Sequence, residues 1–121
     1  MMSEVCYYVD ERGIAPVRDY VLGLEEKQKA KVMAYIKFLS ENGPGMRRPF
    51  ADYLGDKTGI YELRPQRHRV LYFFYHRDKI ILLHAFLKRT RELPQKDIRL
   101  AQDRKDHCEV LLKLEKVDLE S

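Results

Sequence analysis

The sequence predicts an α+β fold, in which helices pack on one face of a small, mostly antiparallel sheet. Three observations support this prediction. Two amphipathic segments come early in the chain, three strand-like segments follow one another, and a polar segment with helical spacing comes last. The expected order is β-α-α-β-β-β-α, with two N-terminal helices on one face of the sheet and a C-terminal helix.

The first three elements are marked by residue spacing and by breakers. Val5–Val9 is a short β-rich run that ends before Gly13. Pro16 suits a first helical turn, and apolar residues then recur at helical spacing as far as Leu24. The segment "EEKQKAKVMAYIKFLSENG" predicts a longer helix, because its acidic start favours a helix N-terminus and Gly43-Pro44-Gly45 ends it.

The second half of the chain carries the expected sheet. Met46–Asp56 is irregular, with room for a short edge strand. The main strand candidates are Ile60–Arg64, Arg69–His76 and Lys79–Leu87. The last segment, "LPQKDIRLAQDRKDHCEVLLKLE", predicts a helix with Pro94 at its first position.

Composition limits the class of protein. The 121 residues are 45% hydrophobic, enough for one domain, residues 1–121, with a core that needs no disulfide or metal. Cys6 and Cys108 lack the close spacing of a zinc site, and no cofactor is expected. The chain opens with acidic residues, unlike a signal peptide, and has no apolar run long enough to span a membrane. We therefore expect a cytoplasmic protein with reduced thiols.

Basic residues concentrate in the middle of the chain. Between Arg47 and Arg91 there are 11 Lys and Arg against 4 Asp and Glu, although the net charge of the whole chain is only +4. A basic middle inside a mildly acidic chain is typical of a protein that contacts phosphate groups.

Two arginines are predicted to oppose each other in the sheet. If residues 65–68 form a four-residue hairpin loop, Arg64 faces Arg69 and the two share one sheet face with Glu62. Like charges placed opposite each other destabilise a sheet by up to ~1 kcal/mol. Two explanations follow from the residues: Glu62 bridges to an arginine, or the pair binds an anion such as phosphate, which suits the guanidinium fork.

The pattern "YELRPQRHRVLYFF" followed by "LLHAFLKRTRELPQKDIRLA" resembles the RelE/ParE superfamily of toxins from bacterial type II toxin–antitoxin systems. The resemblance is closest to the HigB-like, phage-derived branch. That branch typically has a Tyr/Trp-Glu-Leu-Arg strand, an Arg before apolar and aromatic residues, and a Leu-Leu-His-Gly-Phe-x-Lys-Lys segment ahead of a helix. The match covers about Asp56 to Arg104.

The resemblance implies an endoribonuclease, or mRNA interferase, that cleaves messenger RNA without a metal, in many members on the translating ribosome. The RNA 2′-hydroxyl would attack the phosphate. Arg69 and Arg89 would then stabilise charge on phosphorus, Arg64 would position the RNA backbone, and Lys88 would transfer a proton. The expected partners are mRNA, the ribosome and a cognate antitoxin, often a helix-turn-helix protein.

Four further residues are expected to contact RNA: Lys57, Arg67, His68 and Phe73. His68 is expected to be exposed in the hairpin turn, and Phe73 to stack on a base from the arginine side of the sheet. His84, inside an apolar strand, is interpreted as a core or supporting histidine, with acid–base catalysis as the alternative.

The sequence departs from the branch in two places. Leu93 replaces the usual Thr before the helix proline, which removes an N-cap. No tyrosine follows Tyr75, whereas some superfamily members use a late tyrosine in catalysis. Two alternatives therefore remain: a non-enzymatic gyrase inhibitor like the ParE branch, and an inactive phage-derived homologue.

Overall fold

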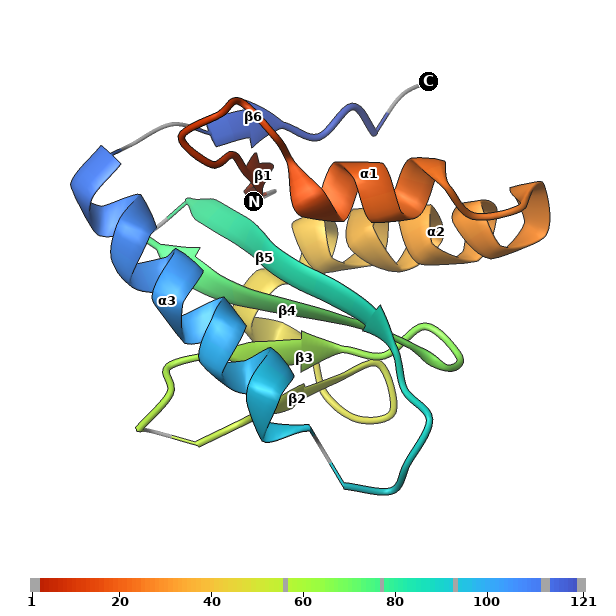
Figure 1. The fold of residues 1–121 in the computed structure, drawn as a ribbon. Coiled ribbons are helices and arrows are strands. Elements are labelled where there is room, and N and C mark those ends of the chain that lie inside the picture. The colour runs from red at the N-terminus through yellow and green to blue at the C-terminus, as the bar shows by residue number, and fades with distance from the viewer. Residues whose placement is uncertain (1–2, 56, 77, 93, 112–113, 120–121) are drawn as a thin grey trace.

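The computed structural model describes residues 3–55, 57–76, 78–92, 94–111 and 114–119. It confirms the predicted fold class, with helices and a mostly antiparallel sheet (Figure 1). Its elements are, in chain order, β1 (Glu4–Tyr8), α1 (Pro16–Leu22), α2 (Glu26–Asn42), a 3-10 turn (Gly43–Gly45), β2 (Ala51–Tyr53), β3 (Tyr61–Leu63), β4 (His68–Tyr75), β5 (Lys79–Leu87), α3 (Gln95–Leu111) and β6 (Leu114–Lys116). The N-cap change at Leu93 lies outside the described residues.

Within the described residues, six strands form one sheet in the order β2-β3-β4-β5-β1-β6. β1 runs parallel to β5, and every other neighbouring pair is antiparallel. β4 and β5 are the longest strands and form the hairpin at the centre of the sheet. The short strand β2 lies at one edge, within the stretch Met46–Asp56 where the sequence leaves room for an edge strand.

One side of the sheet, which we call the α1/α2 face, is closed by the two N-terminal helices. α1 contributes Val17 and Val21, and α2 contributes a buried stripe at helical spacing, Val32, Ile36 and Leu39. The strand residues buried against them are Val5, Tyr7, Leu63, Val70, Tyr72, Ile80 and Leu82. This face holds the larger of the two apolar clusters in the described part of the chain.

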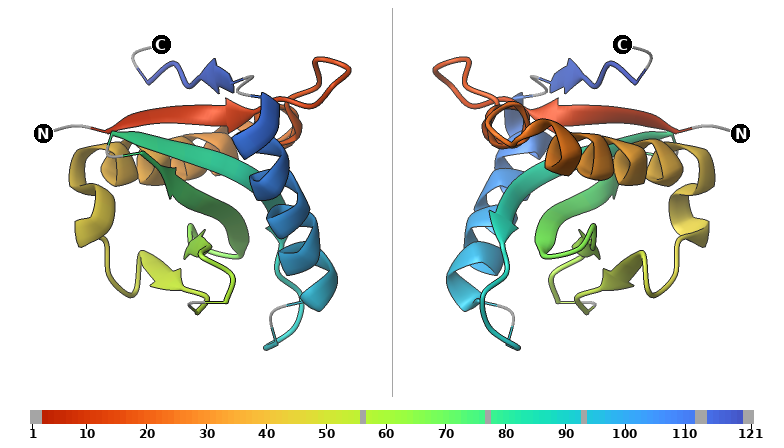
Figure 2. Two further views of the ribbon diagram at one scale, coloured as in Figure 1. Left: turned by 90° about the vertical axis from the view of Figure 1, so that its left-hand side faces the viewer. Right: turned by 90° about the vertical axis from the view of Figure 1, so that its right-hand side faces the viewer.

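The opposite side, which we call the α3 face, packs against the C-terminal helix. Leu71, Phe73, Ile81 and Leu83 are buried there, with Ala101 of α3. Figure 1 shows α3 in front of the strands and α2 passing behind them, and Figure 2 gives the two side views. The expectation that all helices lie on one face is therefore wrong. Because β4 is apolar on both of its faces, each face needs a cover.

The end of the chain also differs from the prediction. The sequence predicts a helix as far as Glu115, but α3 ends at Leu111 and β6 pairs antiparallel with β1. Without β6, β1 would be an edge strand with a row of unsatisfied backbone groups. Sheet pairing therefore overrides the local helix propensity of this segment.

Candidate functional site

The β3–β4 hairpin forms the centre of the candidate site. The predicted register is confirmed, since Tyr61 is opposite Tyr72 and Leu63 is opposite Val70. Continued toward the turn, this register places Arg64 opposite Arg69, and alternation puts both on the α3 face. The turn lies at the end of the sheet on the right of Figure 1, where β5 also ends.

The carboxylate of Glu62 lies between the two guanidinium groups. Its Oε1 is 3.7 Å from Arg64 Nε, and its Oε2 is 3.8 Å from Arg69 Nε. Of the two explanations for the opposed arginines, the structure therefore shows the Glu62 bridge, to both of them. The bridge is loose, because Glu62 Oε2 and Arg69 Nε are both buried without a hydrogen bond to the described residues. Glu62 thus neutralises charge without satisfying every donor.

Arg69 is held rigidly. Its Nη1 donates to the carbonyl oxygens of Gln66, at 2.7 Å, and His68, at 2.8 Å. The residue is only 7% exposed, and burial lowers the pKa of its guanidinium, while the charge of Glu62 acts in the opposite direction. An arginine fixed in this way presents its positive charge in one orientation and loses little side-chain entropy when it meets an anion.

Sequence analysis missed two charged residues of this site, Arg48 and Asp52. Asp52 is opposite Glu62 in the β2–β3 pairing, so the two carboxylates share the α3 face. Arg48 Nη2 donates to Asp52 Oδ2 at 2.5 Å. This bond lowers the pKa of Asp52 and raises that of Arg48. The sequence signal for this pair is an Arg four residues before an Asp. It does not predict the contact, because the register of the three-residue strand β2 against β3 does not follow from the sequence alone.

These five side chains form a row of alternating charge across β2, β3 and β4, which we call the charged row: Arg48, Asp52, Arg64, Glu62 and Arg69. The bond from Arg48 is the main cause of the lowered pKa of Asp52, and the charge of Arg64 adds a smaller effect in the same direction. Three cations and two anions leave an excess of one positive charge. The row is therefore positive but largely compensated.

A β-bulge adds the end of β5 to this surface. The β4–β5 register shifts between Leu71 and Tyr72, so that Leu71 is opposite His84 and Arg69 is opposite Phe86. Strict alternation from Leu82, which is buried on the α1/α2 face, would put His84 and Phe86 on that same face. The bulge instead turns both toward the α3 face, beside Leu71 and Arg69.

His84 links β5 to the start of α3. Its Nε2 is 2.6 Å from Asp97 Oδ1, and its Nδ1 is 3.4 Å from Arg104 Nη1. Burial lowers the pKa of His84, and Arg104 adds to this effect, while the bond to Asp97 opposes it. The ring stacks on Phe86 with centroids 5.5 Å apart. These contacts fit the interpretation of His84 as a supporting histidine, with both ring nitrogens engaged.

The remaining basic residues gather at the same end of the sheet. The N–H of Lys88 donates to the carbonyl of Arg67 at 2.8 Å, which ties the end of β5 to the β3–β4 turn. Alternation carried beyond Phe86 places Lys88 on the α3 face, while Arg67 and Arg89 are exposed. Chain topology thus brings Lys88 and Arg89 close to Arg64 and Arg69.

Three of the expected RNA contacts lie elsewhere or are covered. His68 is 4% exposed on the α1/α2 face, where its ring meets Tyr20 Oη and Gln28 Oε1, each at 2.7 Å, so the expectation that it is exposed is wrong. Phe73 is 3% exposed, and Lys105 Nζ lies 5.6 Å from its ring centroid. Lys57 is exposed in the β2–β3 loop, at the opposite end of β3 from Arg64. Contact of these residues with RNA stays a prediction.

The arrangement suits binding of an anion at the end of the sheet. Arg64 and Arg69 flank Glu62 there, the backbone of Lys88 is bonded to that of Arg67 in the adjoining turn, and phosphate is an anion that clusters of basic residues favour. Among the described residues, no three His, Cys, Asp or Glu side chains come together as metal ligands. In that same part of the chain, no helix combines the length and apolar character that crossing a bilayer requires.

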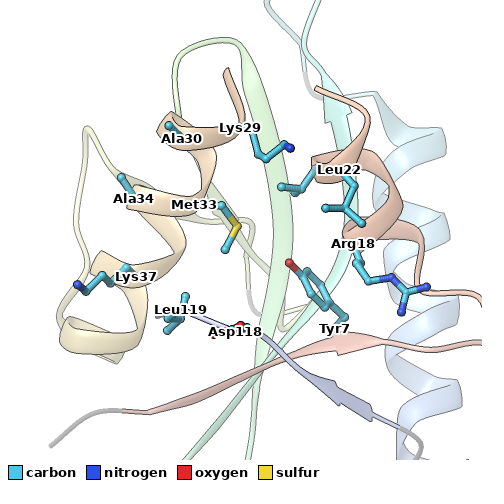
Figure 3. Close-up of a pocket in the computed structure, with 11 residues that line it drawn as sticks. Tyr7, Arg18, Leu22, Lys29, Ala30, Met33, Ala34, Lys37, Asp118 and Leu119 are labelled. Atoms are coloured by element: carbon cyan, nitrogen blue, oxygen red, sulfur yellow. The ribbon is translucent and has the colours of Figure 1, made fainter. Parts of the chain in front are cut away.

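A pocket of about 450 Å³ lies on the other side of the sheet, between α1, α2 and the C-terminal segment (Figure 3). Leu22, which is 61% exposed, and Met33 give it an apolar lining. The cations that line it are Arg18, Lys29 and Lys37. Because it opens on the α1/α2 side, it is separate from the charged row.

Comparison with known proteins gives one family. The family model described as "Phage derived protein Gp49-like (DUF891)" matches residues 19–106, which is more than two thirds of the chain. That family is associated with RelE-like toxins, in agreement with the coarse resemblance in the sequence. A search of curated proteins finds no significant match. The matched segment includes the charged row and the bulged strand β5, and the chain belongs to the Gp49-like family of phage-derived proteins.

Proposed function

We propose that this protein is the toxin of a type II toxin–antitoxin system and that it cleaves messenger RNA on the translating ribosome. The observation that carries the proposal is the cluster of arginine and lysine side chains at one end of the α3 face. Membership in a family associated with RelE-like toxins supports it at the coarse level, including an antitoxin as partner. The antitoxin is expected to be a small helix-turn-helix protein.

The proposed reaction needs no nucleophile from the protein. The RNA 2′-hydroxyl loses its proton and forms a bond to the adjacent phosphorus, the bond from phosphorus to the 5′-oxygen breaks, and that oxygen gains a proton. Arg69 and Arg89 stabilise the charge that builds up on the phosphate oxygens, and Arg64 positions the backbone. Lys88 transfers a proton.

Glu62 gains a role that the sequence did not suggest. In the absence of RNA, it occupies the space between Arg64 and Arg69 and holds both guanidinium groups in place. A phosphate that approaches Arg64, the more exposed of the two arginines, competes with Glu62 for the same donors. RNA should therefore bind more weakly than it would to the same arginines without Glu62. Its phosphate should also meet guanidinium groups that are already held in one orientation.

The test is a cell-free translation reaction in which the ends of cleaved messages are mapped. The informative variant is Arg69→Ala combined with Glu62→Gln, because it removes the stabilising charge without leaving a buried carboxylate alone. We expect cleavage to fall by about 10²–10³-fold, the usual effect of losing one electrostatic contact to a transition state. Arg12→Ala is the matched control, since Arg12 is exposed and pairs only with Asp10 among the described contacts. Cleavage by the double variant at the rate of the unsubstituted protein would contradict the proposal.

A second function has one observation in its favour. The burial of Arg69 against Glu62 and two backbone carbonyls is also what a purely structural arginine would show. A non-enzymatic toxin that inhibits gyrase, or an inactive homologue, would have no need of an accessible Arg69. Intact RNA with accumulating DNA breaks after induction would identify the first, and harmless overexpression the second.

A further inference from the structure

An exposed group of aromatic rings lies on α2 and on the segment that leads into β2. Phe38 and Phe50 are each 38% exposed, which is unusual for an apolar ring of this size. Their centroids are 5.1 Å apart in a T-shaped arrangement, and Tyr35 lies 5.8 Å from Phe50. We call these three rings the aromatic shelf. In a T-shaped pair, one ring contributes only its edge, so its faces are left for other contacts.

The shelf is physically connected to the charged row. Phe50 follows Arg48 by two residues, and Arg48 is the outermost cation of the row. The carbonyl of Phe50 accepts a hydrogen bond from the N–H of Arg64 at 2.8 Å. The segment that leads into β2 therefore carries both Arg48, which pairs with Asp52 of the charged row, and Phe50 of the shelf.

Both cations and carboxylates lie near the shelf, and a cation lies directly against one of its rings. Lys31 Nζ lies 5.6 Å from the ring centroid of Tyr35, and Arg47 is exposed immediately before Arg48. Two carboxylates are also close in the chain: Asp52, which is bonded to Arg48, and Glu41, one helical turn beyond Phe38. Exposed aromatic rings beside cations are the combination that binds single-stranded nucleic acid, because bases stack on the rings while cations follow the backbone.

We propose that the aromatic shelf is a second RNA subsite, on which bases flanking the cleavage position stack after the strand passes Arg48 at the edge of the sheet. This inference rests on the proposed function for the identity of the ligand. It goes further by assigning Phe38 and Phe50 to substrate binding and by predicting that the protein holds more RNA than the charged row alone can cover. A short RNA fills only the charged row, whereas a longer strand reaches the shelf.

The test uses single-stranded 2′-O-methyl RNA, which lacks the nucleophile, so that binding is measured without cleavage. Affinity is compared for oligomers of about four and about twelve nucleotides, the range that small single-strand-binding folds cover. The variants are Phe38→Leu and Phe50→Leu, which keep the apolar volume but remove the stacking surface. Tyr53→Leu is the matched control, because Tyr53 is 39% exposed on β2 and its ring packs on Tyr61 of β3, with centroids 4.5 Å apart.

We expect each shelf variant to bind the long oligomer roughly 5- to 100-fold more weakly, which corresponds to loss of one stacked base, and to bind the short oligomer as before. The control should change neither affinity. Photocrosslinking with 5-bromouridine in the long oligomer should label the peptide that contains Phe38 or Phe50. Thermal unfolding confirms that the variants fold.

Three outcomes separate this inference from the proposed function. If the shelf variants bind the long oligomer as the unsubstituted protein does, while Arg64→Ala weakens both oligomers, the shelf inference is wrong and the RNA-binding row stands. If the shelf variants lose affinity for the long oligomer although no message is cleaved, the subsite stands and the nuclease activity fails. If RNA affinity is unchanged and the shelf variants instead lose binding to a co-expressed antitoxin, the shelf is a protein interface and the inference is overturned.

Discussion

The two faces of the sheet are built from the same strands but differ in the polarity of their side chains. The α1/α2 face is covered by two helices and holds the larger apolar cluster of the described residues, together with the buried His68, which is bonded to Tyr20 and Gln28. The α3 face is apolar beneath α3 but also carries the charged row, in which Glu62 and Arg69 are buried, Arg64 is partly exposed and Arg48 is exposed. Under the proposed function, Arg48 and Arg64 are therefore the members of the row that RNA would meet first.

Under the proposed function, stability and RNA binding are therefore divided between the two faces. Apolar burial on the α1/α2 face supplies most of the driving force for folding. The charged row contributes less, because burying ion pairs costs about as much as their attraction returns. We expect substitutions in the row to affect function more than stability, provided that no buried charge is left without a partner.

The largest expected effect comes from a substitution that leaves a buried charge without one of its partners. Arg69→Ala leaves the Glu62 carboxylate, which is 3% exposed, with Arg64 as its one ion-pair partner among the described residues. Removing one partner of a buried pair costs about 3–5 kcal/mol in the free energy of unfolding. Adding Glu62→Gln should recover most of that loss, because the buried charge is gone. Urea unfolding of the single and double variants measures both values. If the single variant is as stable as the unsubstituted protein, the pair is not buried as described.

A smaller effect is expected on the pH dependence of stability, through one histidine on each face of the sheet. Burial lowers the pKa of both His68 and His84 below the usual value of about 6.5. The unfolded chain therefore takes up protons that the folded protein does not, and stability should fall as pH drops below about 6.5. Stability above that pH should be constant with respect to these two groups.

The two histidines should differ in how much they contribute. The bond from His84 to Asp97 raises its pKa and opposes the effect of burial, whereas Arg69 lowers the pKa of His68 further. Replacing either by Gln should flatten the dependence of the unfolding free energy on pH, measured by urea titration between about pH 7.5 and pH 5.0. A dependence that is equally steep after both replacements would show that other groups control it.

The smallest effect concerns the exposed end of the charged row. Asp52→Asn removes a carboxylate that is bonded to Arg48, whose side chain is 71% exposed. Exposed ion pairs contribute about 0–1 kcal/mol, so thermal unfolding should barely change. Affinity for single-stranded RNA should rise, because the row gains net positive charge, and it should depend more steeply on salt. Weaker binding after this substitution would mean that Asp52 orients Arg48 rather than competing with RNA.

Local patterns explain which predictions succeeded. The register that opposes Arg64 and Arg69 follows from a short loop, since few residues separate the two strands and alternation then assigns their faces. The stripe of Val32, Ile36 and Leu39 follows from the period of a single helix. The prediction for His68 failed because it was placed in the turn, whereas it begins β4 and points into the α1/α2 face.

The sequence by itself determined the fold class, the main strands and helices and the register of the central hairpin, because each depends on residues that are near one another in the chain. Only the tertiary structure decided that α3 crosses to the other face, that β6 completes the sheet, and that the bulge in β5 turns Phe86 toward Arg69. It also decided that Glu62 bridges both arginines and that Arg48 and Asp52 extend the row. These features depend on contacts between distant segments, whose free energies are set by packing and desolvation rather than by local spacing.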